Sequence, residues 1–206
     1  ALGGIAYLAD FSIGASIGMT YGTTNAIYSI LFAAIIIFIT GIPLAYYAAR
    51  YNIDLDLITR GAGFGYFGSV ITSIIFASFT FIFFALEGSI MAQGLLLGLG
   101  IPLWAGYLIS TIMVIPLVIY GMKALSKLQV WTTPIWLILM IGPVAYLIHK
   151  EPNLVGSFAT YAGNSGYAPM DMAAIMLGAG VCLSLIMQIG EQIDYLRFMP
   201  AKTKEN

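Results

Sequence analysis

The chain has 206 residues, of which 60% are hydrophobic and 8% are charged, and its mean hydropathy is +0.95. Soluble domains carry about 25% charged residues, so this composition excludes an ordinary soluble protein. It predicts an all-α, polytopic protein of the cell (inner) membrane. The formal net charge of −1 gives no reason to expect nucleic acid as a partner, and one Cys with one His is too few for a disulfide or a zinc site.

Six apolar segments, separated by polar links, are expected to be membrane helices that belong to one transmembrane domain over residues 1–206. The chain begins in apolar sequence without a Met and ends in a polar run, so we expect a piece of a longer protein. The six segments are Leu2–Met19, Ala26–Ala49, Gly68–Leu99, Leu103–Tyr120, Leu128–Ile148 and Met172–Ile193.

Lysine and arginine are distributed unevenly over the links. When the links are assigned alternately to the two sides, seven basic residues fall on one side and only Lys150 falls on the other. The positive-inside rule predicts that the side with seven is cytoplasmic and that the loop His149–Asp171 is external. The seven are Arg50, Arg60, Lys123, Lys127, Arg197, Lys202 and Lys204.

Glu87 is the one charged residue between Gly61 and Met122, and it lies inside the third apolar segment. An ionisable side chain near the middle of a bilayer costs about 2.5–3.5 kcal/mol, so it normally faces a protein interior or a wet cavity. Phe83 and Phe84 lie one turn earlier and add an aromatic wall. We therefore expect these three residues to bind a flat polar solute. The alternative is a structural Glu that is neutral or bonded to a neighbouring helix.

The first segment places Asp10 and Ser12 among several glycines. Glycine weakens a helix by about 1 kcal/mol relative to alanine, and an acid in an apolar run is costly. We expect helix one to unwind near Ala9–Gly14, so that Ala9, Asp10 and Ser12 face a ligand or a cation. The alternative places Asp10 at the interface of a truncated helix. A second break is expected near Gly178–Gly180 in the sixth segment.

The sixth segment carries small and polar residues on one helical face, at Gly180, Ser184 and Gln188. Small residues permit close packing, which is the alternative interpretation for the glycines. Because buried amides need hydrogen-bond partners, we expect Gln188, together with Ser184, to contact the substrate.

Glu191, Asp194 and Arg197 share a broad face near the cytoplasmic end of this segment. Arg197 is placed to neutralise a pair of neighbouring acids. An ion cluster or gate at the cytoplasmic interface is the preferred interpretation, and direct contact with the substrate is the alternative.

Three stretches add a resemblance to a known family. They are RGAGFGYFG at Arg60–Gly68, the link from Gly121 through Lys123 to Leu128, Trp131 and Pro134, and DYLRF at Asp194–Phe198. In their order and spacing they resemble nucleobase–cation symporter family 1, the permeases for purines, cytosine, hydantoins and allantoin.

This resemblance implies a fold with a five-plus-five inverted repeat, of which the chain would hold the first six helices, with helices one and six broken at the substrate. It implies uptake of a small heteroaromatic compound with Na⁺ or H⁺ and no other cofactor. Phe83 and Glu87 have the spacing of the family's stacking ring and of its polar partner, although the family often uses Trp and an amide. The range Gly178–Gln192 contains no aromatic residue, which departs from family members that stack a second ring from helix six.

The sequence therefore predicts a cation-coupled secondary transporter of a nucleobase or related heterocycle. The alternative is a ligand-sensing membrane module fused to a C-terminal signalling domain. An intramembrane enzyme is not expected, because His149 lies at a helix end without a nucleophile or an orienting partner nearby in sequence. No catalytic residue and no metal ligand are predicted.

Overall fold

The computed structural model describes residues 7–199, apart from the side chains of Leu117, Val118, Met122 and Lys123. The predictions for residues 2–6, and the cytoplasmic placement of Lys202 and Lys204, lie outside this range. Every regular element among the described residues is helical, which confirms the all-α class. In chain order they are α1 (Leu8–Tyr21), α2 (Thr23–Tyr51), α3 (Leu55–Thr59), the π-helical turn η2 (Arg60–Phe64), α4 (Gly65–Leu99), α5 (Leu103–Lys150), α6 (Leu154–Ala159), α7 (Met172–Leu183), the 3₁₀ turn η3 (Ile186–Gln188) and α8 (Ile189–Leu196).

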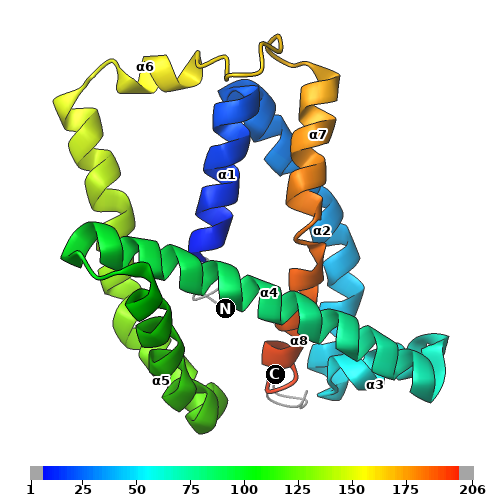
Figure 1. Ribbon diagram of the computed structural model, residues 1–206. Coiled ribbons are helices and arrows are strands. Elements are labelled where there is room, and N and C mark those ends of the chain that lie inside the picture. Colours follow the sequence, from blue (N-terminus) through cyan, green and yellow to red (C-terminus); the bar gives the residue numbers. More distant parts are fainter. Residues whose placement is uncertain (1–6, 200–206) are drawn as a thin grey trace, which may run out of the picture. The chain divides into compact units, whose positions relative to one another are not determined.

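The chain forms two compact units, which are described separately. Unit 1 combines Ala1–Ser12 with Phe83–Thr160, and therefore holds the end of α4 together with α5 and α6. Unit 2 combines Ile13–Ile82 with Tyr161–Asn206, and holds α2, α3, α7 and α8 (Figure 1). Helices α1 and α4 each contribute residues to both units.

Within residues 7–199, four helical stretches are long and apolar enough to cross a membrane: Thr23–Tyr51, Leu55–Leu99, Leu103–Gly121 and Ala124–Lys150. The bent pair α7 and η3–α8 makes a fifth if it counts as one span. These lengths support a multi-pass membrane protein. Helix α1 has 14 described residues, or about 21 Å, which is less than the 30 Å thickness of a bilayer core. The sixth crossing therefore stays a prediction.

The link that was expected between the fourth and fifth segments, Gly121–Lys127, is helical rather than a loop. The element α5, Leu103–Lys150, consists of two helices that meet at a kink at Gly121, whose φ of 67° and ψ of −162° are not helical. Glycine adopts a positive φ without the steric cost that other residues meet, so a single residue turns the chain here. The predicted link Gly121–Lys127 thus begins at the residue where the chain turns, but Gly121 alone makes the turn.

The core of unit 2 is the contact between α2 and α7, which lie side by side (Figure 1). Its buried residues are mostly small, as expected where membrane helices approach closely. Gly178 marks the closest approach, because a Cβ at this position would lie 2.5 Å from Ser29 Oγ. The Ser29 hydroxyl shares its one hydrogen between Asn25 O at 2.7 Å and Ile175 O at 2.9 Å, and so joins the two helices.

The end of α1 is completed by a distant loop of unit 2. The last carbonyl groups of a helix have no partners inside it. Here Asn164 N donates to Met19 O at 2.9 Å, and Ser165 N donates to Thr20 O at 3.0 Å. Gly22, at φ 85°, lets the backbone of Ala162 approach so closely that no side chain fits. The loop that was expected to be merely external is therefore part of the helix packing.

Neither predicted helix break lies where it was expected. Ala9–Gly14 is regular helix inside α1, whose first described helical residue is Leu8, so the unwound segment predicted at Ala9, Asp10 and Ser12 is absent there. Helix α7 is regular through Gly178–Gly180. The sixth segment does break, but at Ser184–Leu185, with a 40° bend between the two helices. Glycine composition indicated a weak helix, whereas the interhelical contact at Gly178 shows that this glycine serves packing.

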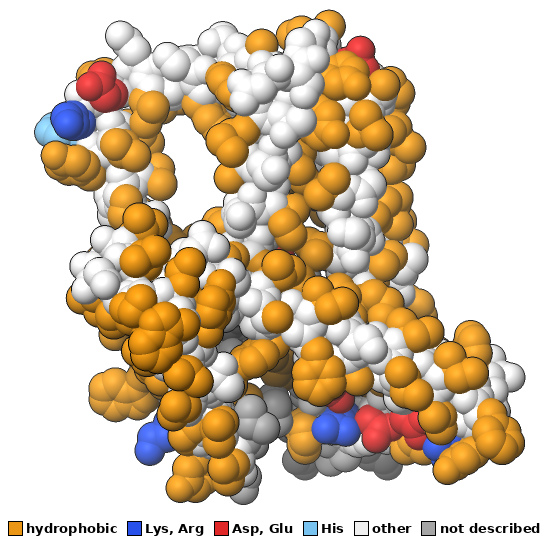
Figure 2. Space-filling view, viewed as in Figure 1, with side chains coloured by type: hydrophobic (Ala, Val, Ile, Leu, Met, Phe, Trp, Pro, Cys, Tyr) orange, Lys and Arg blue, Asp and Glu red, His pale blue; other side chains and the backbone are white. Residues whose placement is uncertain are grey.

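Hydrophobic side chains cover most of the face drawn in Figure 2, and the charged side chains form a few small groups. Large apolar residues along α2, α4 and α5 are more than half exposed, among them Phe38, Phe81 and Ile138. Such a surface is unstable in water and suits the hydrocarbon of a bilayer.

Candidate functional site

Glu87 holds the first turn of α1. Its Oε1 accepts a hydrogen bond from Ala9 N at 2.8 Å, and its Oε2 accepts one from Leu8 N at 3.3 Å. The three residues of this contact, Leu8, Ala9 and Glu87, all belong to unit 1. The carboxylate therefore meets two of the backbone N–H groups that a helix start leaves without intrahelical partners. Two predicted site residues, Glu87 and Ala9, are brought together by the fold.

The contact is also favourable electrostatically. The start of a helix carries a partial positive charge, which stabilises a nearby carboxylate. Hydrogen bonds to a charged group contribute about 1.5–3 kcal/mol, which offsets much of the cost of placing Glu87 in an apolar helix. A carboxylate has about four acceptor positions, so two accepted bonds leave capacity for further donors.

Phe83 and Phe84 differ in their surroundings. Phe83 is 4% exposed and meets the ring of Tyr7 edge-on, with ring centroids 5.9 Å apart and planes at 87°. Phe84 is 42% exposed. Phe83, one turn before Glu87, is therefore the buried ring of the two, and it packs against Tyr7.

The remaining substrate candidates, Ser184 and Gln188, lie in unit 2 at the bend that follows α7. The Ser184 hydroxyl donates to Val181 O at 2.6 Å, so it caps its own helix. The Gln188 side chain has a buried Nε2 with no hydrogen-bond partner among the described residues. An amide donor in this state is a candidate for binding an acceptor.

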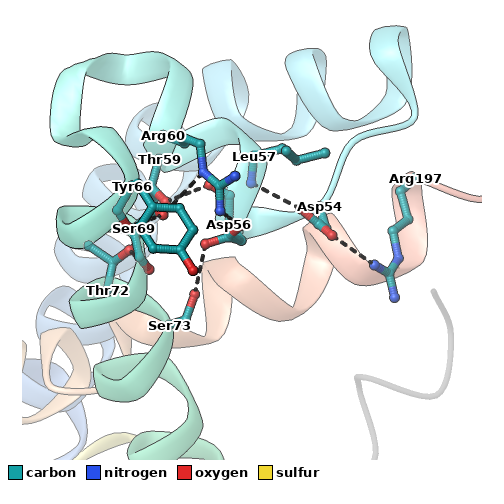
Figure 3. Close-up of polar contacts among 10 residues, drawn as sticks. All are labelled: Asp54, Asp56, Leu57, Thr59, Arg60, Tyr66, Ser69, Thr72, Ser73 and Arg197. Carbon is teal, nitrogen blue, oxygen red and sulfur yellow. Dashed lines mark hydrogen bonds and ion pairs between the residues drawn. The ribbon is translucent and has the colours of Figure 1, made fainter.

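The ion cluster at the end of α8 includes a residue that the sequence did not indicate. Arg197 lies 3.8 Å from Asp194, as expected. It also lies 3.6 Å from Asp54 (Figure 3). Asp54 also caps α3, since its Oδ1 accepts from Leu57 N at 3.0 Å. Glu191 lies in α8, one turn before Asp194.

Asn52 ties the same end of α8 to the end of α2. This residue adopts the left-handed conformation at φ 52°, which asparagine tolerates better than most residues. Its Nδ2 donates to Arg197 O at 2.7 Å and to Met199 O at 2.8 Å. The cluster is thus a structural tie between two chain segments, and its role as a cytoplasmic gate stays a prediction.

A second polar group holds the turn from α3 into α4 (Figure 3). Arg60 pairs with Asp56 at 2.5 Å, and its guanidinium lies over the Tyr66 ring at 5.0 Å. Ser73 Oγ donates to the other oxygen of Asp56 at 3.5 Å. Gly63, at φ 108°, breaks the helical backbone between α3 and α4. The stretch RGAGFGYFG thus builds a tight, internally bonded helical turn.

No family model, no curated protein and no solved structure matches this chain. The described residues also hold no group of three or more His, Cys, Asp or Glu side chains that would bind a metal ion.

Sequence reasoning missed Tyr7 and Asp54. Tyr7 is separated from Phe83 by 76 positions, and only the contact between α1 and α4 brings the two rings together. For Asp54 a signal was present, because Asp is a preferred N-cap residue and accepts from the backbone N–H three residues later, here Leu57 N. Its second role beside Arg197 depends on the tertiary fold.

Proposed function

We propose that the chain is the membrane module of a secondary transporter for a small heterocyclic solute with ring N–H groups, such as a nucleobase or a hydantoin. The observation that carries the proposal is the Glu87 carboxylate, which is oriented by Leu8 N and Ala9 N and retains acceptor capacity. A fixed carboxylate in an apolar helix is suited to accept hydrogen bonds from a neutral solute.

The aromatic pair supports a flat solute. Phe83 lies one turn before Glu87, so a ring bonded to the carboxylate would lie near its face. Phe83 is 4% exposed and already meets Tyr7 in a T-shaped contact, so stacking of a solute on this ring requires neighbouring side chains to move. The start of α1, through Leu8 N and Ala9 N, and the preceding residue Tyr7 therefore both contact the candidate site.

Gln188, in unit 2, is a separate candidate for binding a solute. Its buried Nε2 is a donor, and heterocycles such as cytosine and hydantoin carry carbonyl acceptors. The driving ion, Na⁺ or H⁺, is a further part of the proposal, which uptake measured under separate Na⁺ and H⁺ gradients distinguishes.

The test is equilibrium binding to the purified chain in detergent, with cytosine, hypoxanthine and hydantoin as probes. We expect one of them to bind. Glu87→Gln removes one acceptor and the charge, so the Kd should rise about 10- to 100-fold. Glu87→Leu should abolish binding. Glu151→Gln, an exposed acid in the loop after α5, is the matched control and should bind like the wild type.

Two results would contradict the proposal. One is wild-type affinity in Glu87→Leu, which would make the carboxylate purely a cap of α1. The other is the absence of binding for all three heterocycles to a folded protein.

A further inference from the structure

One face of α2 changes character along its length. Ile35, Ile39 and Ile42 recur three or four residues apart and are half or more exposed. Tyr46, which is 50% exposed, and Arg50 continue the same face to the end of the helix. The face is therefore aliphatic first, then aromatic, then cationic. From Ile42 to Arg50 it covers about 12 Å along the helix axis.

The guanidinium of Arg50 is held by rings. It lies 5.5 Å from the Tyr46 centroid and 5.6 Å from the Tyr51 centroid, and it donates a hydrogen bond to the Tyr46 hydroxyl. Tyr47 stacks on Tyr51 with centroids 6.0 Å apart and planes at 13°. Stacking orders the side chain while leaving its other N–H donors free to bind.

The charge of Arg50 also differs from that of the other two arginines. Arg60 pairs with Asp56, and Arg197 lies near both Asp54 and Asp194. Among the described residues Arg50 has no carboxylate within 4 Å. Its neighbours are neutral phenols, so its positive charge is not compensated locally.

We propose that Tyr46, Tyr47, Arg50 and Tyr51 form a binding site for the headgroup phosphate of an anionic phospholipid, whose acyl chains lie along Ile35, Ile39 and Ile42. Guanidinium groups match the oxygens of a phosphate with paired N–H donors. Tyrosines concentrate at the boundary between hydrocarbon and headgroups, where their rings are apolar and their hydroxyls are wet.

The order of residues along α2 favours a lipid over a soluble phosphate. A soluble anion needs only the guanidinium, whereas a lipid also needs an exposed aliphatic face that leads up to it. The exposed isoleucines supply this face on the same side of the helix. As a single cation near the bilayer surface, Arg50 should contribute about 1 kcal/mol to lipid binding, which is about fivefold in affinity.

The test is a titration of the purified full chain with dioleoyl phosphatidylglycerol, with bound lipid counted by native mass spectrometry. Arg50→Gln should weaken the apparent affinity about fivefold. Arg50→Lys keeps the charge but loses the planar donors, so its affinity should lie between those of the wild type and Arg50→Gln. Lys127→Gln removes an exposed cation that lies outside this tyrosine cluster and should leave the affinity unchanged. Dioleoyl phosphatidylcholine should bind more weakly, with no dependence on Arg50.

Three outcomes would overturn the proposal. Unchanged phosphatidylglycerol affinity in Arg50→Gln would remove the site. An equal loss in Lys127→Gln would show a general charge effect. Competition by glycerol 3-phosphate at concentrations similar to those of the lipid would indicate a soluble phosphate as the ligand. Arg50 is exposed, so Arg50→Gln is expected to fold, and the retained melting temperature of the variant checks this.

Discussion

The two units of this chain use polar groups in opposite ways. In unit 2, Asn25 and Ser29 are buried, and their side chains bridge the backbones of packed segments. In unit 1, Glu87 bonds two backbone N–H groups and still has acceptor positions left. A polar side chain in an apolar helix is thus structural when its bonding capacity is used, and a candidate for function when capacity remains.

The difference extends to how closely the backbones pack. Gly178 of α7 allows contact with Ser29 of α2, and Gly190 of α8 lies so close to the ring of Phe76 that no side chain would fit. Around Glu87 the glycines of α4 are unconstrained, since a Cβ at Gly88 or Gly94 would meet no atom within 4 Å. Unit 2 is therefore the region where substitutions should affect stability most, and the α1–α4 contact the region where they should affect binding most.

The largest expected effect is that of Gly178→Ala. The added methyl group would lie 2.5 Å from Ser29 Oγ and 3.1 Å from a methyl group of Ile17, so the helices must separate. We expect a loss of about 1–3 kcal/mol, read as a lower thermal midpoint in detergent. Gly180→Ala is the matched control, since its Cβ would meet no atom within 4 Å, and it should be neutral or slightly stabilising. Equal effects of the two variants would contradict close packing at Gly178.

Asn25→Ala should rank second. The Asn25 side chain donates to Tyr21 O and Ala168 O and accepts from Asp171 N, at 2.9–3.0 Å. Its removal leaves backbone groups unpaired at a buried position and should cost about 1–2 kcal/mol in chemical unfolding. Gln93→Ala removes an exposed amide and should cost less than 0.5 kcal/mol, since surface substitutions fall within about ±0.5 kcal/mol. Comparable losses would show that Asn25 is not a structural bridge.

Glu87→Gln should affect binding more than stability, which is the opposite of what we expect for the variants in unit 2. The variant loses one of two bonds to the start of α1 and the charge near the helix end, so it should cost about 0.5–1 kcal/mol of stability. Hydrogen exchange at Leu8 and Ala9 should become faster. In the binding assay with heterocycles, the same variant should lose far more affinity than Asn25→Ala. If Asn25→Ala lowers the affinity as much, the distinction between the units fails.

The smallest effects are expected for the two partly exposed ion pairs, Asp56–Arg60 and Asp54–Arg197. Both side chains of the first pair are more than a third exposed, so a double-mutant cycle with Asp56→Asn and Arg60→Gln should give a coupling of about 0.2–1 kcal/mol that falls with salt. The Asp54–Arg197 pair, at 3.6 Å, should couple more weakly still. A salt-independent coupling well above this range would place the turn from α3 to α4 among the buried, essential contacts.

The features that depend only on hydropathy and charge could be predicted from the sequence. The apolar segments are helices, and Glu87, as a lone acid in a long uncharged run, is a residue with a specific bonded role. Glycine was less informative. Gly178 and Gly180 look alike in sequence, but one packs on Ser29 and the other meets no atom within 4 Å. Only the tertiary fold separates a glycine needed for close approach from one that weakens a helix.

Positions joined over long chain distances also escaped prediction. Tyr7 and Phe83, or Asp54 and Arg197, have no periodicity that relates them, because each pair is set by how two helices meet. The break in the sixth segment was expected from Gly178–Gly180 but lies at Ser184–Leu185. Ser184 bonds back to Val181 O there, and hydroxyl groups that compete with the helical backbone are known to bend helices.

The completion of α1 by the loop at Asn164 and Ser165 has a consequence for the order of events during synthesis. The carbonyl groups of Met19 and Thr20 receive their donors only after roughly 145 more residues have been made. At about 5–20 residues per second, the ribosome needs on the order of 10–30 s to supply them. During that time the newly inserted α1–α2 hairpin has an unfinished end, which water or the insertion machinery has to satisfy. A nascent chain that pauses before residue 164 should therefore expose the end of α1 to proteases, and the exposure should disappear once Ser165 has left the ribosome.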